Sequence, residues 1–479
     1  MRYKKGQDKL QISMLGNSLD EYICDNHICR VIDAFVEKLD MVELGFKYAE
    51  PKQTGQQPYN PKMMLKLYIY GFLNRIRSSK RLEAETLRNI EMMWLLCKLS
   101  PDDKTISNFR HDNPKALKLA FRAFCKMINC WGLYGKKTIA IDGTKIRANN
   151  SRKKNHNETN VKKKLEILEK QITEYMNKLE ENDISDQSDV KLNDDKIKEV
   201  LKYLTDKKTE FKGYLEQIES NDGKEISTVD ADCRLMKKGG NNGMDCCYNV
   251  QTAVDAENNL IVESEISQNP NDTKELLPMV DKAKEILEAE GITALADKGY
   301  YNPNDILACE EKGTTCYIPK PKSGKQIEDE DYRINKFTYQ KSSDDYLCPS
   351  KNILTKTGNV KKADLNYAIY TNKDACKNCE VKDKCTKSKA GFRSIQRSEL
   401  QDKMDTIDAR FKENFDIYKK RQAIVEHPYG TIKRGWGFDH FLCKGKDLVG
   451  GENALACLAY NLRRIINIWG AKRLISELI

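Results

Sequence analysis

Two short apolar runs, each ending at an aspartate, constrain this chain more than any other feature. The first is Thr138–Ile141, followed by Asp142, and the second is Ile292–Ala296, followed by Asp297. Their Ile, Thr, Ala and Leu residues suit a pleated, packed surface, so each run is predicted to be a buried strand. A glycine follows each aspartate closely and would allow a turn there. A carboxylate leaving a buried strand is costly unless a positive group meets it, although an Asp that only caps a turn is common.

A third acid, Glu426, lies in residues 421–434, which are predicted to be helical. Two strand-end aspartates and one helix glutamate form a candidate metal site, because hard divalent cations take oxygen ligands. Two such ions about 3.5–4 Å apart can activate a nucleophile and hold the leaving oxygen in phosphoryl transfer.

These motifs resemble those of the DDE transposases of bacterial insertion sequences, whose catalytic core is ribonuclease-H-like. The resemblance covers most of the chain and is carried by an ordered set of segments: Tyr59–Met64, Ser78–Leu82, Pro101–Arg110, Ile141–Thr144, Tyr248–Gln251, Ala296–Tyr300, Arg421–Arg434 and Ala459–Arg464. One such motif would be weak evidence, but the ordered set is specific.

The resemblance implies roles for particular residues. Asp142 would bridge two Mg²⁺ or Mn²⁺ ions, and Asp297 and Glu426 would complete their ligand shells. Relatives often carry Tyr, Arg, Glu and Lys on the third-acid helix, and the matching residues are Tyr418, Arg421, Glu426 and Lys433. Lys433, Arg421 and Arg434 would contact DNA. Four residues separate Arg421 from Glu426, whereas part of the family has three.

The predicted fold class is α/β, with a ribonuclease-H-like mixed sheet flanked by helices. An all-helical N-terminal domain, an inserted helical hairpin and a Cys-rich insertion are added to this core. Periodicity gives the class, and the resemblance gives the topology. The predicted parts are residues 1–135 (helical, DNA-binding), 136–156 (first catalytic strand), 157–225 (hairpin), 226–320 (core continued), 321–395 (Cys-rich insertion) and 396–479 (C-terminal catalytic and packing helices).

The hairpin is predicted from two heptad series of apolar residues separated by an acidic, turn-rich segment at 181–195. The first series is Val161, Leu165, Leu168, Ile172, Tyr175 and Leu179, and the second is Ile197, Leu201, Leu204, Phe211, Leu215 and Ile218. Each series is short for an independent coiled coil, so they are expected to pair with each other or with another protomer.

Four cysteines, Cys348, Cys376, Cys379 and Cys385, fall in the polar segment 319–394. A C-x2-C pair, a third Cys after five residues and a fourth upstream can supply four thiolates to Zn²⁺. The alternatives are a cluster of unligated thiols and a disulfide, which a reducing compartment disfavours. Most of the other 12 cysteines stand singly in apolar patterns and are expected to be buried thiols.

Composition limits the class of protein. The chain is 39% hydrophobic and 32% charged, and its formal net charge of +10 agrees only weakly with a polyanionic partner. No run approaches the ~18 apolar residues of a membrane span. The basic start of the chain, at Met1–Lys5, is not followed by the roughly 7–15 apolar residues of a secretory signal. A cytoplasmic protein without membrane contact is therefore expected.

The sequence is therefore interpreted as a transposase that binds the inverted ends of its element, cleaves DNA and joins the freed 3′ hydroxyl to target DNA. Double-stranded DNA and further copies of the chain are the expected partners. A first alternative is a ribonuclease-H-like nuclease that only cuts. A second is a catalytically inactive DNA-binding regulator.

Overall fold

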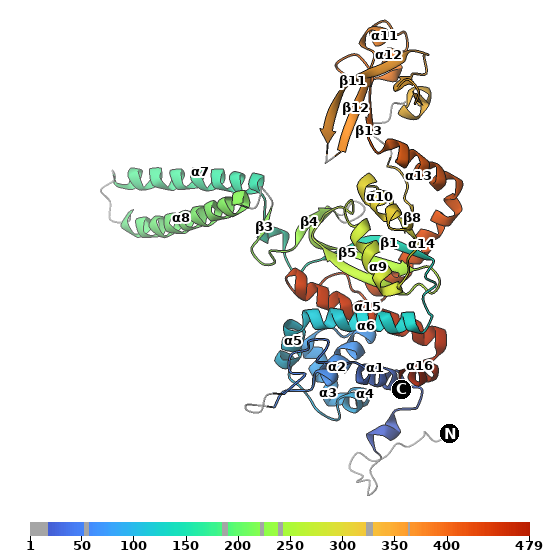
Figure 1. Cartoon of the computed structure of the whole chain (residues 1–479). Coiled ribbons are helices and arrows are strands. Elements are labelled where there is room, and N and C mark those ends of the chain that lie inside the picture. The colour runs from blue at the N-terminus through green and yellow to red at the C-terminus, as the bar shows by residue number, and fades with distance from the viewer. Residues whose placement is uncertain are drawn as a thin grey trace, which may run out of the picture. The chain divides into compact units, whose positions relative to one another are not determined.

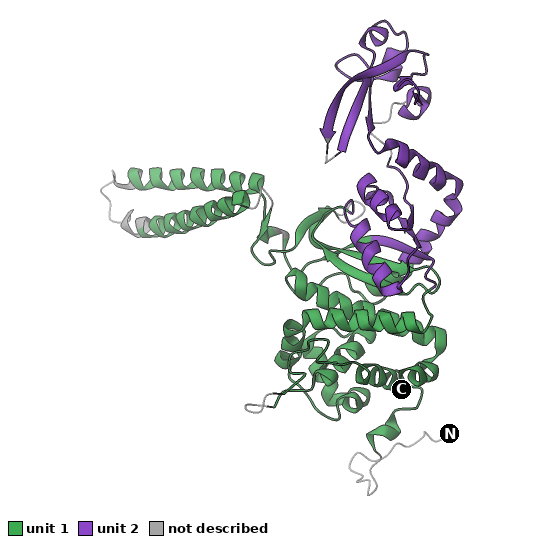
Figure 2. Ribbon diagram, in the orientation of Figure 1, with its two compact units in different colours: residues 1–134, 143–271, 426–479 green, residues 135–142, 272–425 purple. Residues whose placement is uncertain are grey.

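The computed structural model describes residues 18–51, 57–183, 190–220, 225–237, 243–321, 329–362 and 365–479. The chain divides into two compact units (Figure 2). Unit 1 comprises residues 1–134, 143–271 and 426–479, and unit 2 comprises residues 135–142 and 272–425. Both units contain helices and strands, so the predicted α/β class is confirmed. No helix among these described residues is long and apolar enough to cross a membrane.

The N-terminal part of unit 1 is helical. After a 3-10 turn, η1 (Leu19–Tyr22), it contains α1 (Ile28–Glu37), α2 (Pro61–Leu73), α3 (Ser79–Arg88), α4 (Ile90–Leu95), α5 (Asp103–Asp112) and α6 (Pro114–Cys130). Local sequence explains the helix starts. Pro61 and Pro114 occupy the first positions of α2 and α6, where the missing N–H costs nothing. Asp102 caps α5 by accepting the Thr105 N–H at 2.6 Å.

Helix α15 (Lys446–Trp469) is the centre of the unit 1 core. Every residue from Gly451 to Leu462 is buried, because the helix contacts α2, α6 and β6 (Ile261–Ser267) (Figure 1). Asn461 joins it to that strand. Its Oδ1 accepts the Ile261 N–H at 2.8 Å, and its Nδ2 donates to the Ile261 carbonyl at 2.7 Å. The short helix α16 (Ala471–Leu478) follows.

The strands of unit 1 are antiparallel. β5 (Met244–Asp255) pairs through its first residues with β4 (Arg234–Lys237) and through its later residues with β6. Residues of the Ala459–Arg464 motif bind the turn between β5 and β6. Tyr460 OH donates to the Asn259 carbonyl at 2.7 Å, and Arg464 Nε donates to the Asn258 carbonyl at 2.9 Å.

Two long helices of unit 1, α7 (Glu158–Asp183) and α8 (Val190–Ser220), lie side by side (Figure 1). The apolar heptad residues named above are buried or half-buried. Lys208, which interrupts the second series, pairs with Glu169 at 3.0 Å. At the base lie η2 (Arg152–Lys154) and the strand pair β2 (Asn155–His156) and β3 (Ile226–Ser227). Of the acidic turn, residues 184–189 lie outside the described chain.

Unit 2 contains a parallel arrangement of strands. β1 (Thr138–Arg147), whose residues up to Asp142 belong to this unit, pairs with β7 (Ile292–Ala296), and β7 pairs with β8 (Thr314–Tyr317). Helix α9 (Leu276–Leu287) precedes β7, and the 3-10 turn η3 (Lys298–Tyr300) and helix α10 (Pro303–Glu311) connect β7 to β8.

The turn predicted after Asp142 is wrong. β1 continues through Gly143 to Arg147. Beyond the acid it is held within unit 1, where the Ala148 N–H donates to the Cys246 carbonyl at 2.9 Å and Phe441 N–H donates to the Arg147 carbonyl at 2.8 Å. These backbone bonds keep the chain extended, so glycine's conformational freedom is not used here.

The polar segment of unit 2 contains a five-stranded antiparallel sheet that the sequence analysis did not predict. Its strand order is β13-β12-β11-β10-β9. The strands are β9 (Thr338–Gln340), β10 (Asp345–Leu347), β11 (Ile353–Lys362), β12 (Leu365–Thr371) and β13 (Ser394–Ser398). Short helical pieces accompany them: η4 (Glu330–Tyr332), η5 (Ile334–Lys336), α11 (Lys373–Lys377) and α12 (Lys382–Cys385). A small core of Phe337, Tyr346, Leu354, Tyr370 and Ile395 supports one face.

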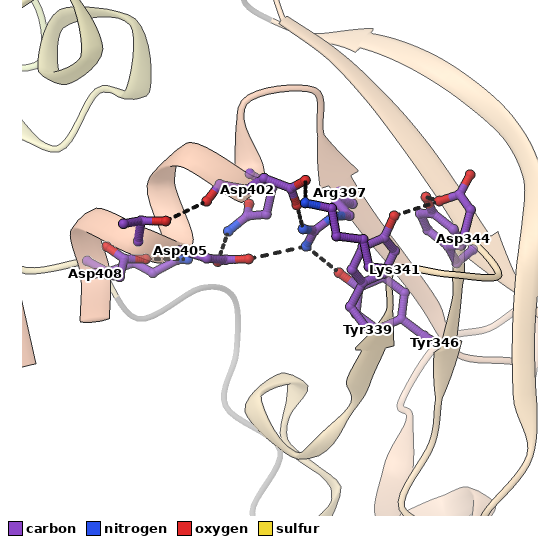
Figure 3. Close-up of polar contacts among 12 residues, drawn as sticks. Tyr339, Lys341, Asp344, Tyr346, Arg397, Asp402, Asp405 and Asp408 are labelled. Atoms are coloured by element: carbon purple, nitrogen blue, oxygen red, sulfur yellow. Dashed lines mark hydrogen bonds and ion pairs between the residues drawn. The ribbon is translucent and has the colours of Figure 1, made fainter. Parts of the chain in front are cut away.

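Arg397, on β13, joins this sheet to the next helix, α13 (Gln401–Glu413) (Figure 3). Its guanidinium donates to Asp402 and, at 3.4 Å, to Asp405, and it stacks 3.8 Å from the ring centroid of Tyr339. The far end of α13 is joined to the parallel strands, because Arg410 donates to Glu310 and to the Cys316 carbonyl.

The segment that leads to Glu426 forms two helices. α13 ends at Glu413, and α14 (Phe415–Tyr429) starts after Asn414. Phe415 is 45% exposed. Pro428 does not end α14, and a π-helical turn, η6 (Gly430–Gly435), follows directly.

The hairpin seam can be tested with a pair of neighbouring substitutions. Leu168→Asp places a charge in the half-buried seam and is expected to cost roughly 1–3 kcal/mol of local stability. Hydrogen exchange of the α7 and α8 amides in the full-length protein should therefore accelerate. Ile167→Asp is the control, because Ile167 is 56% exposed. Equal exchange in the two variants would contradict the seam.

Candidate active site

Asp142 and Asp297 occupy matching positions on neighbouring strands of unit 2. β1 and β7 are parallel with Ile141 opposite Ala296, and each aspartate is the residue after this pair. Paired strands run about 4.7–4.9 Å apart. The two half-buried carboxylates therefore extend from adjacent backbone positions, which is a suitable starting geometry for ligands to a shared cation.

Arg421, on the unit 2 part of α14, supplies positive charge to this pair. Its Nη1 lies 3.4 Å from Asp142 Oδ1, and the two side chains are 17% and 25% exposed. The guanidinium also lies 6.0 Å from the Tyr418 ring centroid. The sequence expectation that a positive group meets the strand-end acid thus holds at Asp142. Two adjacent carboxylates provide the oxygen ligands that a divalent cation prefers.

Asp297 is fixed by the turn that follows it. Its Oδ1 accepts the Gly299 N–H at 2.7 Å. A Cβ at Gly299 would lie 2.9 Å from that oxygen and 3.5 Å from Asp272 Oδ2, so glycine is needed to let the two carboxylates approach its backbone. Asp272 is a nearby acid that the sequence analysis missed. Its signal was weak, since Asn271-Asp272-Thr273 looks like an ordinary helix start.

Glu426 lies later on α14, in the part of the helix that belongs to unit 1, and its side chain is exposed. Five positions separate it from Arg421, so a single helix carries both residues. The structure brings Asp142 and Asp297 together within one unit and places Glu426 in the other.

Lys433 lies on the π-helical turn η6 of unit 1. Its Nζ donates to Thr144 Oγ1 at 2.9 Å and to the Lys145 carbonyl at 3.1 Å. Lys433 therefore binds β1 two and three residues after Asp142. Pro428 lacks the N–H of a regular helix, and the chain continues with longer-range bonds, such as Trp436 N–H to the Thr431 carbonyl at 2.8 Å. π-Helical turns of this kind are frequent at functional sites. Arg434 is exposed on the same turn.

Two histidines near the acids have structural contacts. Tyr460 OH donates to Asn259, so at 2.7 Å it accepts a hydrogen bond from His427 Nδ1. Burial holds the pKa of His427 below its usual value, which fits a neutral, hydrogen-bonded ring. His440 contacts the neighbouring Asp439 at 2.7 Å, which lowers the pKa of that carboxyl.

The four cysteines of the insertion, Cys348, Cys376, Cys379 and Cys385, line one cavity of about 30 Å³. The Asn352 N–H donates to Cys348 Sγ at 3.3 Å. Burial raises the pKa of the Cys385 thiol, and the other three thiols raise it further. No disulfide is present among the described cysteines. The four thiols are thus mutual neighbours, although no three of these sulfurs lie within 4.8 Å of one another.

A tighter donor set among the described residues is His27, Cys29 and Glu91, whose ligand atoms all lie within 4.8 Å. Hydrogen bonds within the fold account for the closeness of these three side chains. His27 Nδ1 accepts the Cys29 N–H at 3.2 Å at the start of α1, and Tyr70 OH donates to Glu91 at 2.7 Å. Burial, with Glu91 nearby, raises the pKa of the Cys29 thiol well above its usual value, which disfavours the thiolate a metal needs.

Comparison with known families agrees with these features. A model described as a transposase domain (DUF772) matches residues 17–112, and a model described as a transposase DDE domain matches residues 347–466. These two matches support a DDE transposase of an insertion sequence. No curated protein matches it.

The matched regions support different parts of this transposase. The first covers helices α1 to α5, and the second covers most of the insertion sheet together with Glu426 and Lys433. Asp142 and Asp297 lie outside both matches. The DDE domain makes the chain an enzyme of the nucleotidyl-transferase type and implies the use of divalent metal.

The role of Gly299 is testable without DNA. Gly299→Ala should push the Asp297 carboxylate away from the backbone N–H of residue 299. The affinity for Mn²⁺ should then fall about 10-fold or more, as it does when other metal ligands lose their orientation. Isothermal titration of the purified protein with Mn²⁺ measures this. Gly213→Ala is the control, because no atom lies within 4 Å of its added Cβ. Equal Mn²⁺ affinity in the two variants would show that this contact does not orient Asp297.

Proposed function

We propose that this transposase binds the terminal inverted repeats of its insertion sequence, cleaves DNA there and joins the freed 3′ end to target DNA. Asp142, Asp297 and Glu426 would hold two Mg²⁺ or Mn²⁺ ions. The observation that carries the proposal is the register of β1 and β7, which puts the first two acids side by side. Such ions activate a hydroxyl nucleophile and stabilise the leaving oxygen.

The order of elements along the chain supports a ribonuclease-H-like core. Strand β1 is followed, after the helical hairpin, by the antiparallel pair β5 and β6, then α9, β7, α10 and β8. The Arg421 and Asp142 pair connects the helix that carries Glu426 to the strand that carries the first acid. The proposal therefore uses Glu426 as the third ligand.

Basic residues would position DNA beside these acids. Lys433 holds β1 beyond Asp142 through Thr144 and Lys145, so its charge is fixed close to the first acid along the strand. Arg434 is exposed on the same turn. Arg421, which already contacts Asp142, would balance carboxylate charge and hold phosphate.

The N-terminal helices would recognise the element ends. Lys104, Asn108 and His111 are exposed on α5, whereas Ile106 and Phe109 are buried. Such a polar face can contact phosphates and base edges. We further propose that several copies act together on DNA in the cytoplasm.

Two other functions would give different reaction products. A nuclease of the same fold would cut element ends without forming strand-transfer products. An inactive regulator would bind DNA and would not cleave it with any divalent metal. Incubation with element-end DNA, target plasmid and Mg²⁺ separates all three, since only a transposase yields joined products.

Replacement of each acid tests the catalytic set. Asp142→Asn, Asp297→Asn and Glu426→Gln keep side-chain shape and remove charge, so each should lower Mg²⁺-dependent cleavage by about 100-fold or more, because such ions contribute several kcal/mol. DNA binding should persist, since its salt-dependent affinity comes from Lys and Arg. Glu413→Gln, at an exposed position on α13, is the control. Robust cleavage by any acid variant would remove that acid from the set.

Zinc is a second cofactor that we propose, held by Cys348, Cys376, Cys379 and Cys385. The donor set fits, because four thiols surround one cavity and a backbone N–H already donates to one sulfur. Four thiolates suit tetrahedral Zn²⁺, and binding would draw the sulfurs closer together. The metal would be structural and would join α11 and α12 to the insertion sheet.

The zinc proposal predicts about one zinc per chain in protein purified without chelator. Cys379→Ser should lose most of that zinc, as measured by elemental analysis. Cys130→Ser provides the control, because Cys130 is an exposed thiol outside the insertion. A zinc content that Cys379→Ser leaves unchanged would exclude this site.

A further inference from the structure

The insertion contains one of the strongly basic segments of this chain. Residues 348–398 contain 12 Lys and Arg against four Asp and Glu, whereas the whole chain has 82 against 72. This segment thus carries a net charge of +8 out of +10. It corresponds to strands β11 to β13 with α11 and α12. The insertion is therefore more basic than the chain as a whole, as is the segment 143–164, which has eight Lys and Arg against one acid.

The two faces of the insertion sheet differ in chemistry. One face packs on the apolar core through Leu354, Tyr370 and Ile395. On the other face, Thr355 of β11, Thr371 of β12 and Ser394 of β13 form one row across the three strands. On this face the Thr371 hydroxyl is buried and donates to Thr357 Oγ1 at 3.1 Å, and the Thr357 hydroxyl donates to the Ile369 carbonyl at 3.3 Å. Thr355, by contrast, is exposed.

A groove of about 870 Å³ lies on the hydroxyl-bearing face. Thr355, Thr357 and Thr371 line its sheet side, and Lys373, Ser388 and Arg393 come from the helical pieces and the loop before β13. Lys373 Nζ lies 5.4 Å from the ring centroid of Phe392, which also lines the groove. The acid Asp374 is there too. Hydroxyl, ammonium and guanidinium groups are the side chains that contact phosphate oxygens.

Internal contacts account for only part of this lining. Arg393 donates to the Cys385 carbonyl at 3.3 Å and lies 5.5 Å from the Phe337 ring centroid, so it also supports the fold. Lys373 is exposed, and no ion pair to it is recorded among the described residues. Its contact with the Phe392 ring does not neutralise its charge.

We infer that this groove binds the sugar-phosphate backbone of duplex DNA. The inference rests on the proposed action of the protein on DNA and assigns a contact to a part of the chain that holds none of the proposed catalytic residues. A duplex is favoured over a single strand because Phe392 is the one aromatic ring among the groove residues, whereas single-strand binding uses stacking on successive rings.

The test compares variants of the full-length protein that introduce a negative charge inside or outside the groove. Lys373→Glu and, separately, Ser388→Glu should weaken binding of a duplex of unrelated sequence about tenfold at low salt. The slope of log affinity against log salt should fall by about 1 for Lys373→Glu, as for loss of one phosphate contact. Fluorescence anisotropy measures both quantities. Lys336→Glu is the control, because Lys336 lies in the same insertion but outside the groove. Lys336 pairs with Asp331 at 3.8 Å, and both side chains are exposed, so loss of this pair should cost little stability.

The outcomes are distinguishable. If wild-type protein has no affinity for duplex DNA, both the proposed function and this inference fail. If wild-type protein binds and the groove variants bind as Lys336→Glu does, the inference alone is wrong. If the groove variants lose affinity for single-stranded DNA alone, the assignment of a duplex to the groove is wrong. The groove variants should unfold at the same temperature as Lys336→Glu. If Lys373→Glu alters the fold, weaker duplex binding by Ser388→Glu with an unchanged unfolding temperature still supports the groove.

Discussion

The parallel register of β1 and β7 is the constraint on which the candidate site depends. Ile141 pairs with Ala296, so the next residue on each strand is an aspartate, and two negative charges extend from neighbouring positions. Like charges this close oppose folding unless something compensates them. Arg421 supplies part of that charge at 3.4 Å from Asp142, and the Gly299 N–H stabilises Asp297. The remaining negative charge is what makes the pair suitable for a divalent cation.

Within each unit, side chains far apart in sequence hold the elements that carry the site. In unit 1, Asn461 on α15 binds the backbone of β6 in both directions, and Lys433 binds β1. In unit 2, Arg397 and Arg410 secure the two ends of α13, which leads into α14. These contacts use charged or amide groups that are partly or fully buried, where an unmet partner would be costly. They therefore specify position as well as contributing stability.

Much of this arrangement could be predicted from sequence, and the physical reason is periodicity. The heptads of the hairpin and the β-branched runs before Asp142 and Asp297 depend only on local pattern. The strand beyond Asp142 was mispredicted because backbone bonds from Ala148 and Phe441 override the glycine signal. The insertion sheet was missed because its strands are short or polar on one face, as β11 shows with Thr355 and Thr357 exposed. Asp272 was missed because its proximity to Gly299 arises only in the folded chain.

The same reasoning distinguishes the insertion from the active site. The proposed catalytic role of Asp142 and Asp297 requires that each carboxylate be held within a fraction of an ångström, and the pairing of Ile141 with Ala296 fixes the backbone directly before each aspartate. Phosphate contacts along a DNA backbone tolerate looser geometry, because charge attraction falls slowly with distance and flexible lysines adjust. A small sheet with a basic face can therefore be inserted between β8 and α13 without disturbing the acids, provided that both ends of α13 remain fixed. The contacts of Arg397 and Arg410 meet that condition.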